Sequence, residues 1–135
     1  MKRILLYTIL FFFFTSCLQN MGNIGPIFGK WQLKELQTES KTVVYDSIFY
    51  NFQRKYIYLQ KLAEIPHVVY HNVGYFIRTD DELMLDIRDC AIERIGIYQL
   101  PDTTATFKVL ELSNKKMVLR LGEDSIYTFR KAGRY

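Results

Sequence analysis

The chain has few of the residues on which common enzyme sites and disulfide-stabilised folds depend. Its 135 residues include two cysteines, two histidines and one tryptophan. It also lacks a glycine-rich phosphate loop, a Gly-x-Ser-x-Gly sequence and a Cys-x-x-Cys sequence. These absences remove the usual sequence signatures of nucleotide-binding proteins, serine hydrolases and thiol oxidoreductases.

Basic and acidic residues are interspersed along the chain. There are 18 Lys and Arg against 14 Asp and Glu, and mixed runs such as residues 78–81 and 86–89 combine both signs. A nucleic-acid-binding domain would concentrate its basic residues on one face or stripe. We therefore expect no nucleic-acid partner.

The first seventeen residues combine a basic start, an apolar run and a cysteine. Lys2 and Arg3 favour the cytoplasmic side of a membrane, and residues 4–14 are apolar but too short to span one permanently. This pattern predicts a signal peptide over residues 1–16. Residues 14–17, Phe-Thr-Ser-Cys, resemble a bacterial lipobox, which implies cleavage before Cys17 and a lipid on that residue.

The predicted lipid would anchor a tether and one folded domain to a membrane. Residues 18–26 contain Gly, Pro and Asn without periodicity, which is typical of a flexible tether. We assign residues 17–27 to the lipidated cysteine and tether, and residues 28–135 to a single domain. Residues 18–20 carry no acid, and the resemblance to anchored lipoproteins then implies the periplasmic face of an outer membrane.

With Cys17 lipidated, Cys90 has no cysteine left for an internal disulfide. A nucleophilic cysteine needs a base and a lowered thiol pKa, whereas Asp86 and Asp89 would raise the pKa. We therefore expect Cys90 to be a small buried or half-buried residue.

From residue 28 onward the apolar residues recur with a period of two, in segments rich in Tyr, Phe, Val, Ile and Thr. Strands are expected at residues 30–36, 42–46, 55–61, 67–78, 82–88, 104–112, 116–121 and 125–131, and residues 89–95 fit one helical turn. The connections are too short for the helical crossovers of parallel pairing. The sequence thus predicts an all-β, antiparallel up-and-down meander of about eight strands, which closes into a small barrel because an open sheet leaves unpaired edges.

The two ends of this domain carry a family resemblance. Gly29-Lys30-Trp31 resembles the Gly-x-Trp signature of the lipocalins and their calycin relatives, and Arg130 stands where their last strand carries an arginine. In that family the arginine packs on the tryptophan, a cation–π contact of about 0.5 to 2 kcal/mol. The domain resembles small lipocalin-like lipoproteins of the Bacteroides group, which implies that Gly29, Trp31 and Arg130 close one end of the barrel.

Tyrosine is the most suggestive residue type for binding, because the chain has ten. Aromatic rings that line a barrel can hold an apolar or sugar ligand, but tyrosine also fills strand surfaces with its hydroxyl in water. We predict Tyr56, Tyr70 and Tyr75 as residues that would line a ligand cavity. The structural interpretation of these tyrosines remains the alternative.

Metal and acid chemistry find little support in the sequence. His67 and His71 would lie roughly 13 Å apart on a strand, too far for one metal ion, so no metal site or cofactor is predicted. Asp86, Asp89 and Glu93 would converge only at a helical turn, where two carboxylates suit a sugar hydrolase. Ion pairs with neighbouring arginines are the alternative, and no catalytic residue is assigned.

The sequence therefore predicts a lipid-anchored, non-enzymatic protein of the cell envelope that binds a small apolar ligand in its barrel. The alternative is an interaction or inhibitor module with a packed core, and a hydrolase that uses the acidic residues comes third. A filled interior with an exposed apolar patch on one wall would favour the interaction module. A roomy interior would favour the carrier.

Overall fold

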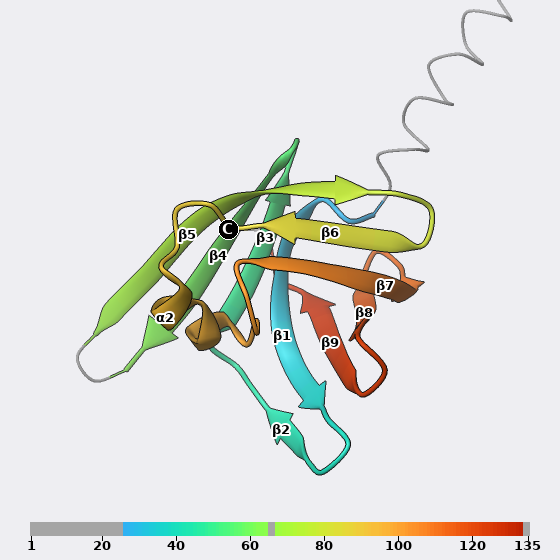
Figure 1. Ribbon diagram of the computed structural model, residues 1–135, viewed down its shortest axis with the longest axis horizontal. Helices are drawn as coiled ribbons and strands as arrows, with labels where there is room; N and C mark the ends of the chain where they lie inside the picture. Colours follow the sequence, from blue (N-terminus) through green and yellow to red (C-terminus); the bar gives the residue numbers. More distant parts are fainter. Residues whose placement is uncertain (1–25, 65–66, 134–135) are drawn as a thin grey trace, which may run out of the picture.

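The alternating segments of the sequence form one antiparallel sheet of nine strands (Figure 1). The computed structural model describes residues 26–64 and 67–133, so the predicted signal peptide and Cys17 lie outside the described residues. The strands are β1 (Gly29–Gln37), β2 (Thr42–Val44), β3 (Ile48–Gln53), β4 (Tyr56–Ala63), β5 (Val68–Arg78), β6 (Glu82–Asp86), β7 (Thr104–Leu112), β8 (Lys116–Leu121) and β9 (Ser125–Lys131).

Eight of these strands close into a barrel, as the sequence predicts. From β3 to β9 each strand pairs with the next one along the chain, and β9 returns to pair with β1. Across that closing pair Trp31 lies opposite Lys131, and Leu36 lies opposite Tyr127. The short β2 pairs with the far end of β1, outside the closed ring of strands.

The segment 47–61, in which the sequence showed only one clear strand, forms the hairpin of β3 and β4. Its turn lies at Arg54 and Lys55, where Arg54 has a φ of 55°. The expected helical turn is also present, as α2 (Ile92–Ile95) followed by the 3-10 helix η1 (Gly96–Tyr98). These two short helices lie in the connection between β6 and β7.

The period of two divides each strand into an inner and an outer face. On β4 the inner residues Ile57 and Leu59 have no exposed surface, and on β6 the same holds for Leu83 and Leu85. Burial of apolar surface contributes about 25 cal/mol per Å². The alternation therefore both stabilises the barrel and fixes which residues face outward.

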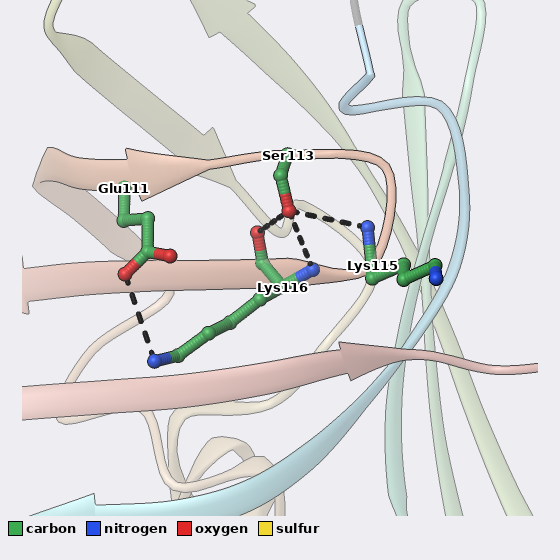
Figure 2. Close-up of polar contacts among 4 residues, drawn as sticks. All are labelled: Glu111, Ser113, Lys115 and Lys116. Atoms are coloured by element: carbon green, nitrogen blue, oxygen red, sulfur yellow. Dashed lines mark hydrogen bonds and ion pairs between the residues drawn. The ribbon is translucent and has the colours of Figure 1, made fainter.

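The hairpin between β7 and β8 shows how one turn residue fixes a strand register (Figure 2). The Oγ of Ser113 accepts hydrogen bonds from the backbone N–H groups of Lys115 and Lys116, and donates one to the Lys116 carbonyl. An ion pair of 3.6 Å joins Glu111 to Lys116 beside the turn. Since both side chains of this pair are about half exposed, the serine contributes more to the geometry than the ion pair does.

Candidate functional site

One end of the barrel is closed at the start of β1. The Trp31 side chain is fully buried there, and its Nε1 donates a hydrogen bond of 2.7 Å to the carbonyl oxygen of Ile27. The Nζ of Lys131 lies 4.4 Å from the centroid of the tryptophan ring and donates to the carbonyl oxygens of Pro26 and Phe28. Burial lowers the pKa of Lys131, and the ring face and carbonyl oxygens offset part of its lost hydration.

The cation on this tryptophan is Lys131, so the prediction that Arg130 packs there is wrong. Side chains alternate along β9, where Phe129 is fully buried and Arg130 is exposed. Lys131 shares the inner face with Phe129 and lies opposite Trp31 in the β1–β9 pair. The expected cation–π contact with Trp31 is present, but Lys131 makes it, one position after Arg130.

Gly29 has a steric role at the same end. Its φ is 110°, a conformation that glycine adopts readily and other residues rarely. A Cβ added to it would lie only 2.8 Å from the Cε of Lys131. Gly29 thus leaves the room that the lysine needs in order to cover Trp31.

The interior of the barrel is filled by large side chains. Those without exposed surface include Trp31, Tyr50, Phe52, Phe107 and Phe129. Aromatic rings pack against each other there: the ring centroids of Tyr50 and Phe129 are 4.9 Å apart, and those of Phe52 and Phe76 are 5.0 Å apart. An eight-stranded barrel is just wide enough for side chains to fill it. The interior therefore has the packed character that the interaction-module alternative requires.

The opposite end of the barrel, which we call the mouth, is closed by residues 91–100. Tyr98 is fully buried there, and its hydroxyl donates a hydrogen bond of 2.7 Å to Oδ1 of Asn72. Its carbonyl accepts one of 2.7 Å from the hydroxyl of Tyr50, while Tyr127 donates to the carbonyl of Gln99. Burial raises the pKa of Tyr98 and of Tyr127 to about 12, so both hydroxyls stay protonated at neutral pH.

A depression of about 590 Å³, which we call the mouth hollow, lies between β5 and the segment 91–100. It is lined by Tyr70, Asn72, Asp89, Ala91, Glu93, Arg94 and Ile97. Small-molecule sites have volumes of roughly 300 to 1,000 Å³. The guanidinium of Arg94 lies 5.8 Å from the ring centroid of Tyr70. Tyr70 therefore lines a hollow at the mouth, not a cavity within the barrel, and its role in ligand binding stays a prediction.

The other two predicted ligand-binding tyrosines lie on the outside. Tyr56 and Tyr75 are opposite each other in the β4–β5 pair, with ring centroids 5.3 Å apart. Their neighbours Ile57 and Phe76 are buried, whereas Tyr75 is 40% exposed. The expectation that Tyr56 and Tyr75 line a cavity within the barrel is thus corrected, because strand alternation turns both outward.

The outer face of β4, β5 and β6 carries seven exposed apolar side chains, which we call the apolar wall. Its members are Tyr58, Leu62, Val69, Val73, Tyr75, Ile77 and Met84, each 36–57% exposed. Cross-strand pairs join six of them: Leu62 with Val69, Tyr58 with Val73, and Ile77 with Met84, with the polar pair of Gln60 and His71 between the first two. Apolar side chains that gather on one exposed face of a protein are typical of interaction sites. The apolar wall is therefore the second candidate site.

The acidic residues considered for catalysis make structural contacts or face solvent. Asp86 forms an ion pair of 2.8 Å with Arg88. Oδ1 of Asp89 accepts a hydrogen bond of 2.9 Å from the backbone N–H of Val73, and Glu93 is exposed on α2. Asp86 thus makes the ion pair with a neighbouring arginine that was the alternative to catalysis, whereas Asp89 holds the chain after β6 against β5.

The remaining candidate residues are a cysteine and two histidines. Cys90 is 8% exposed, and burial, with a smaller contribution from Asp89, raises the pKa of its thiol. His67 and His71 both face solvent, and within residues 26–64 and 67–133 no three His, Cys, Asp or Glu side chains are grouped to hold a metal ion. Cys90 is the buried residue that the sequence analysis expected.

Two residues of the mouth escaped the sequence analysis. Asn72 is 7% exposed and Tyr98 is fully buried, yet neither was singled out. The available signal was the position of Asn72 on the same face of β5 as Phe76, because a polar residue on an inner face must have a hydrogen-bond partner. The partner comes from residues 91–100, whose path across the mouth no local pattern gives.

Comparisons with known proteins give consistent results. A family model for a lipocalin-like domain matches residues 12–132. A lipocalin-like protein from Bacteroides uniformis has a TM-score of 0.71 and 26% identity, over 80% of this chain and 100% of that chain. An uncharacterized protein from Bacteroides eggerthii has a TM-score of 0.68 and 29% identity, over 78% of this chain and 98% of that chain. The curated proteins include no match, and none of the helices in the described part is long and apolar enough to cross a membrane.

Proposed function

Because the chain belongs to the lipocalin-like domain family, we propose that it is a non-enzymatic binding protein of the cell envelope that acts through the outside of its barrel. The barrel presents the apolar wall to a protein partner, and its packed interior serves as the scaffold. A lipid on Cys17 holds the domain near the membrane, at the periplasmic face of an outer membrane.

The observation that carries this proposal is the contrast between the inner and outer faces of β4 to β6. Inside, Ile57, Leu59 and Leu85 are fully buried. Outside, Ile77 is 57% exposed and Val69 is 45% exposed, although both are as apolar as the residues within. A partner that covers the outer side chains would gain about 25 cal/mol per Å² of apolar area, before the costs of association.

The anchor determines where such a partner must be. Residues 18–26 span at most roughly 30 Å when fully extended. The described chain begins at Pro26, next to Lys131 at the closed end of the barrel. The partner is therefore a protein of the same membrane or of the periplasm close to it.

A small ligand bound at the mouth hollow is the second candidate function, and the position of Tyr70 beside Arg94 favours it. The hollow mixes acidic, basic, aromatic and apolar groups, which suits a ligand with both polar and apolar surface. This candidate uses residues other than those of the apolar wall, so substitutions can separate the two.

Photo-cross-linking of the full-length chain in its own membrane tests the proposed function. A photoreactive amino acid at Ile77 is expected to join the protein to one discrete partner, because this position is the most exposed of the apolar wall. The matched control is Arg130, which is exposed on β9 in a different part of the barrel. Adding Val73→Lys should abolish the cross-link from Ile77.

Equal cross-linking from Ile77 and Arg130, or none from Ile77, would contradict a role for the apolar wall. A small-ligand function predicts a different result: thermal stabilisation of the purified protein by a lipid or another apolar compound, lost in Tyr70→Ala and kept in Val73→Lys. Loss of the cross-link in Val73→Lys thus supports the protein-binding function, and loss of thermal stabilisation in Tyr70→Ala supports the small-ligand function.

A further inference from the structure

Strand β5 has a free edge along its first half. It pairs with β4 from Val68 to Tyr75, but with β6 only from Tyr75 to Arg78. Figure 1 shows β5 continuing well beyond the end of β6. Residues 68–73 therefore have a paired strand on the β4 side only.

The cause of this free edge is the close approach of the chain after β6 to Gly74. A Cβ on Gly74 would lie 2.4 Å from the carbonyl oxygen of Asp86 and 2.7 Å from Cδ1 of Ile87. The chain therefore crosses β5 on its inner side at this point, where Ile87 is fully buried, and continues to α2. Because it leaves the sheet at Gly74, it does not continue alongside the first half of β5.

The hydrogen bonds show which backbone groups face the free edge. The N–H of Phe76 donates to the carbonyl of Lys55, on the β4 side. The N–H of Val73 points to the other side and donates to Oδ1 of Asp89. Since N–H directions alternate along a strand, the N–H groups of Val69 and His71 also point away from β4. Within residues 26–64 and 67–133 these two N–H groups have no hydrogen-bond partner.

Two kinds of surface flank these unpaired groups. On the outer side lie Val69 and Val73 of the apolar wall, 45% and 36% exposed. On the inner side lies the mouth hollow, which has two acids, Asp89 and Glu93, against one base, Arg94. An added strand would alternate its side chains between these two surfaces.

We propose that the first half of β5 binds an extended peptide segment of a protein partner by β-strand addition. The backbone of the segment pairs with Val69 and His71, its apolar side chains extend the apolar wall, and a basic side chain enters the acidic hollow. This proposal rests on the proposed function, since it specifies how the partner protein is held.

The local structure favours a peptide over a second copy of this chain. In a symmetric dimer that pairs β5 of one copy with β5 of the other, both copies of the segment 91–100 would have to fit beside the same short edge. The edge also offers few donors, because Asp89 already occupies the N–H of Val73. A short extended segment needs only the two donors and the hollow that are present.

The experiment uses a random ten-residue peptide library displayed on phage and selected on the purified protein. A selected peptide, made synthetically, is expected to bind and to slow amide hydrogen exchange at Val69 and His71. Val69→Pro removes one of the two donors while leaving the β4 pairing intact, because that N–H points away from β4. It should weaken binding at least tenfold, whereas the matched variant Val69→Ala, which keeps the N–H, should change binding less than threefold.

Several results would overturn the proposal: selection of no peptide, equal binding by Val69→Pro, or protection of the two amides in a dimer without peptide. If Val69→Pro does not fold, the exchange of Val69 and His71 in the wild-type complex decides the question. A cross-link from Ile77 without any edge-binding peptide would retain the proposed function and reject this inference. A peptide that binds the edge of β5 without a cross-link from Ile77 would retain this inference and reject the role of the apolar wall.

Discussion

The two ends of the barrel are closed by different means. At one end Trp31 and Lys131, which are opposite each other on paired strands, make the closure within the sheet. At the mouth the closing residue is Tyr98, which comes from a separate segment and is held by hydroxyl–carbonyl and hydroxyl–amide hydrogen bonds. The first closure belongs to the barrel itself, and the second is an addition to it.

This difference separates stability from recognition. The closed end is made of contacts that any displacement of β1 or β9 would break. The chain that leads to the mouth segment instead leaves the sheet at Gly74, so that β5 stays partly unpaired, and the mouth segment forms one side of a hollow. The free edge of β5 and the mouth hollow thus both lie where the chain departs from the regular meander. Binding residues are commonly found on such connecting segments, which a rigid scaffold holds in place.

The largest effect is expected from truncation of the closed end. Trp31→Ala removes a fully buried ring and its hydrogen bond to Ile27. Such truncations cost about 3 to 5 kcal/mol of unfolding free energy, which urea denaturation measures. Trp31→Phe serves as the control and should cost less, because it keeps most of the ring volume. A loss below about 1 kcal/mol for Trp31→Ala would contradict the role of this residue in closure.

Alkaline pH should distinguish the two ends. The pKa of Tyr98 and of Tyr127 in the folded protein is about 12, above the ordinary value of 10. A raised folded-state pKa gives stability that is complete below pH 10 and is lost as the pH rises toward 12. The lowered pKa of Lys131 acts in the opposite sense, since its burial becomes less costly as the pH approaches the ordinary value of 10.5.

Urea midpoints measured from pH 8 to 12 check this expectation, with Tyr98→Phe as the matched variant. At neutral pH this variant should lose about 1 to 3 kcal/mol, because Oδ1 of Asn72 is left without its donor. It should also lose less stability than the wild type between pH 10 and 12. An unchanged slope in the variant would show that Tyr98 does not titrate with unfolding.

The smallest effect concerns the cation at the closed end. Lys131→Met should destabilise the protein by about 0.5 to 2 kcal/mol, because it removes the cation from the ring of Trp31. Arg130→Met should stay within about 0.5 kcal/mol, since Arg130 is exposed. Thermal unfolding of the two variants measures the difference, and a larger effect of Arg130→Met would restore the original assignment of that residue.

The fold could be predicted from the sequence because its signals are local. The strands at residues 104–112, 116–121 and 125–131 agree with β7, β8 and β9 at both ends. The period of two also grouped Val69, Val73, Tyr75 and Ile77 on one face. What it could not give was which face is the inner one, because both faces of β5 carry large apolar or aromatic residues.

The rest of the site depends on contacts between distant parts of the chain. The place of Tyr70 at a hollow requires the segment 91–100 to lie across the mouth, and the free edge of β5 follows from the approach of Asp86 to Gly74. The prediction named Arg130 where the structure has Lys131 on Trp31, and this error has a simpler cause. The family resemblance supplied a residue type, whereas the parity of β9, with Phe129 inward, decides the position.

The bond between Lys131 and the carbonyl of Pro26 has a mechanical consequence. A membrane anchor would pull on the chain at Pro26, and β1 follows three residues later. β1 is bonded to β3 on one side and to β9 on the other, and Lys131 links the last strand to the point where the load enters. Tension from the anchor would be shared between two ladders at once, so no single edge strand could be peeled from the barrel by it.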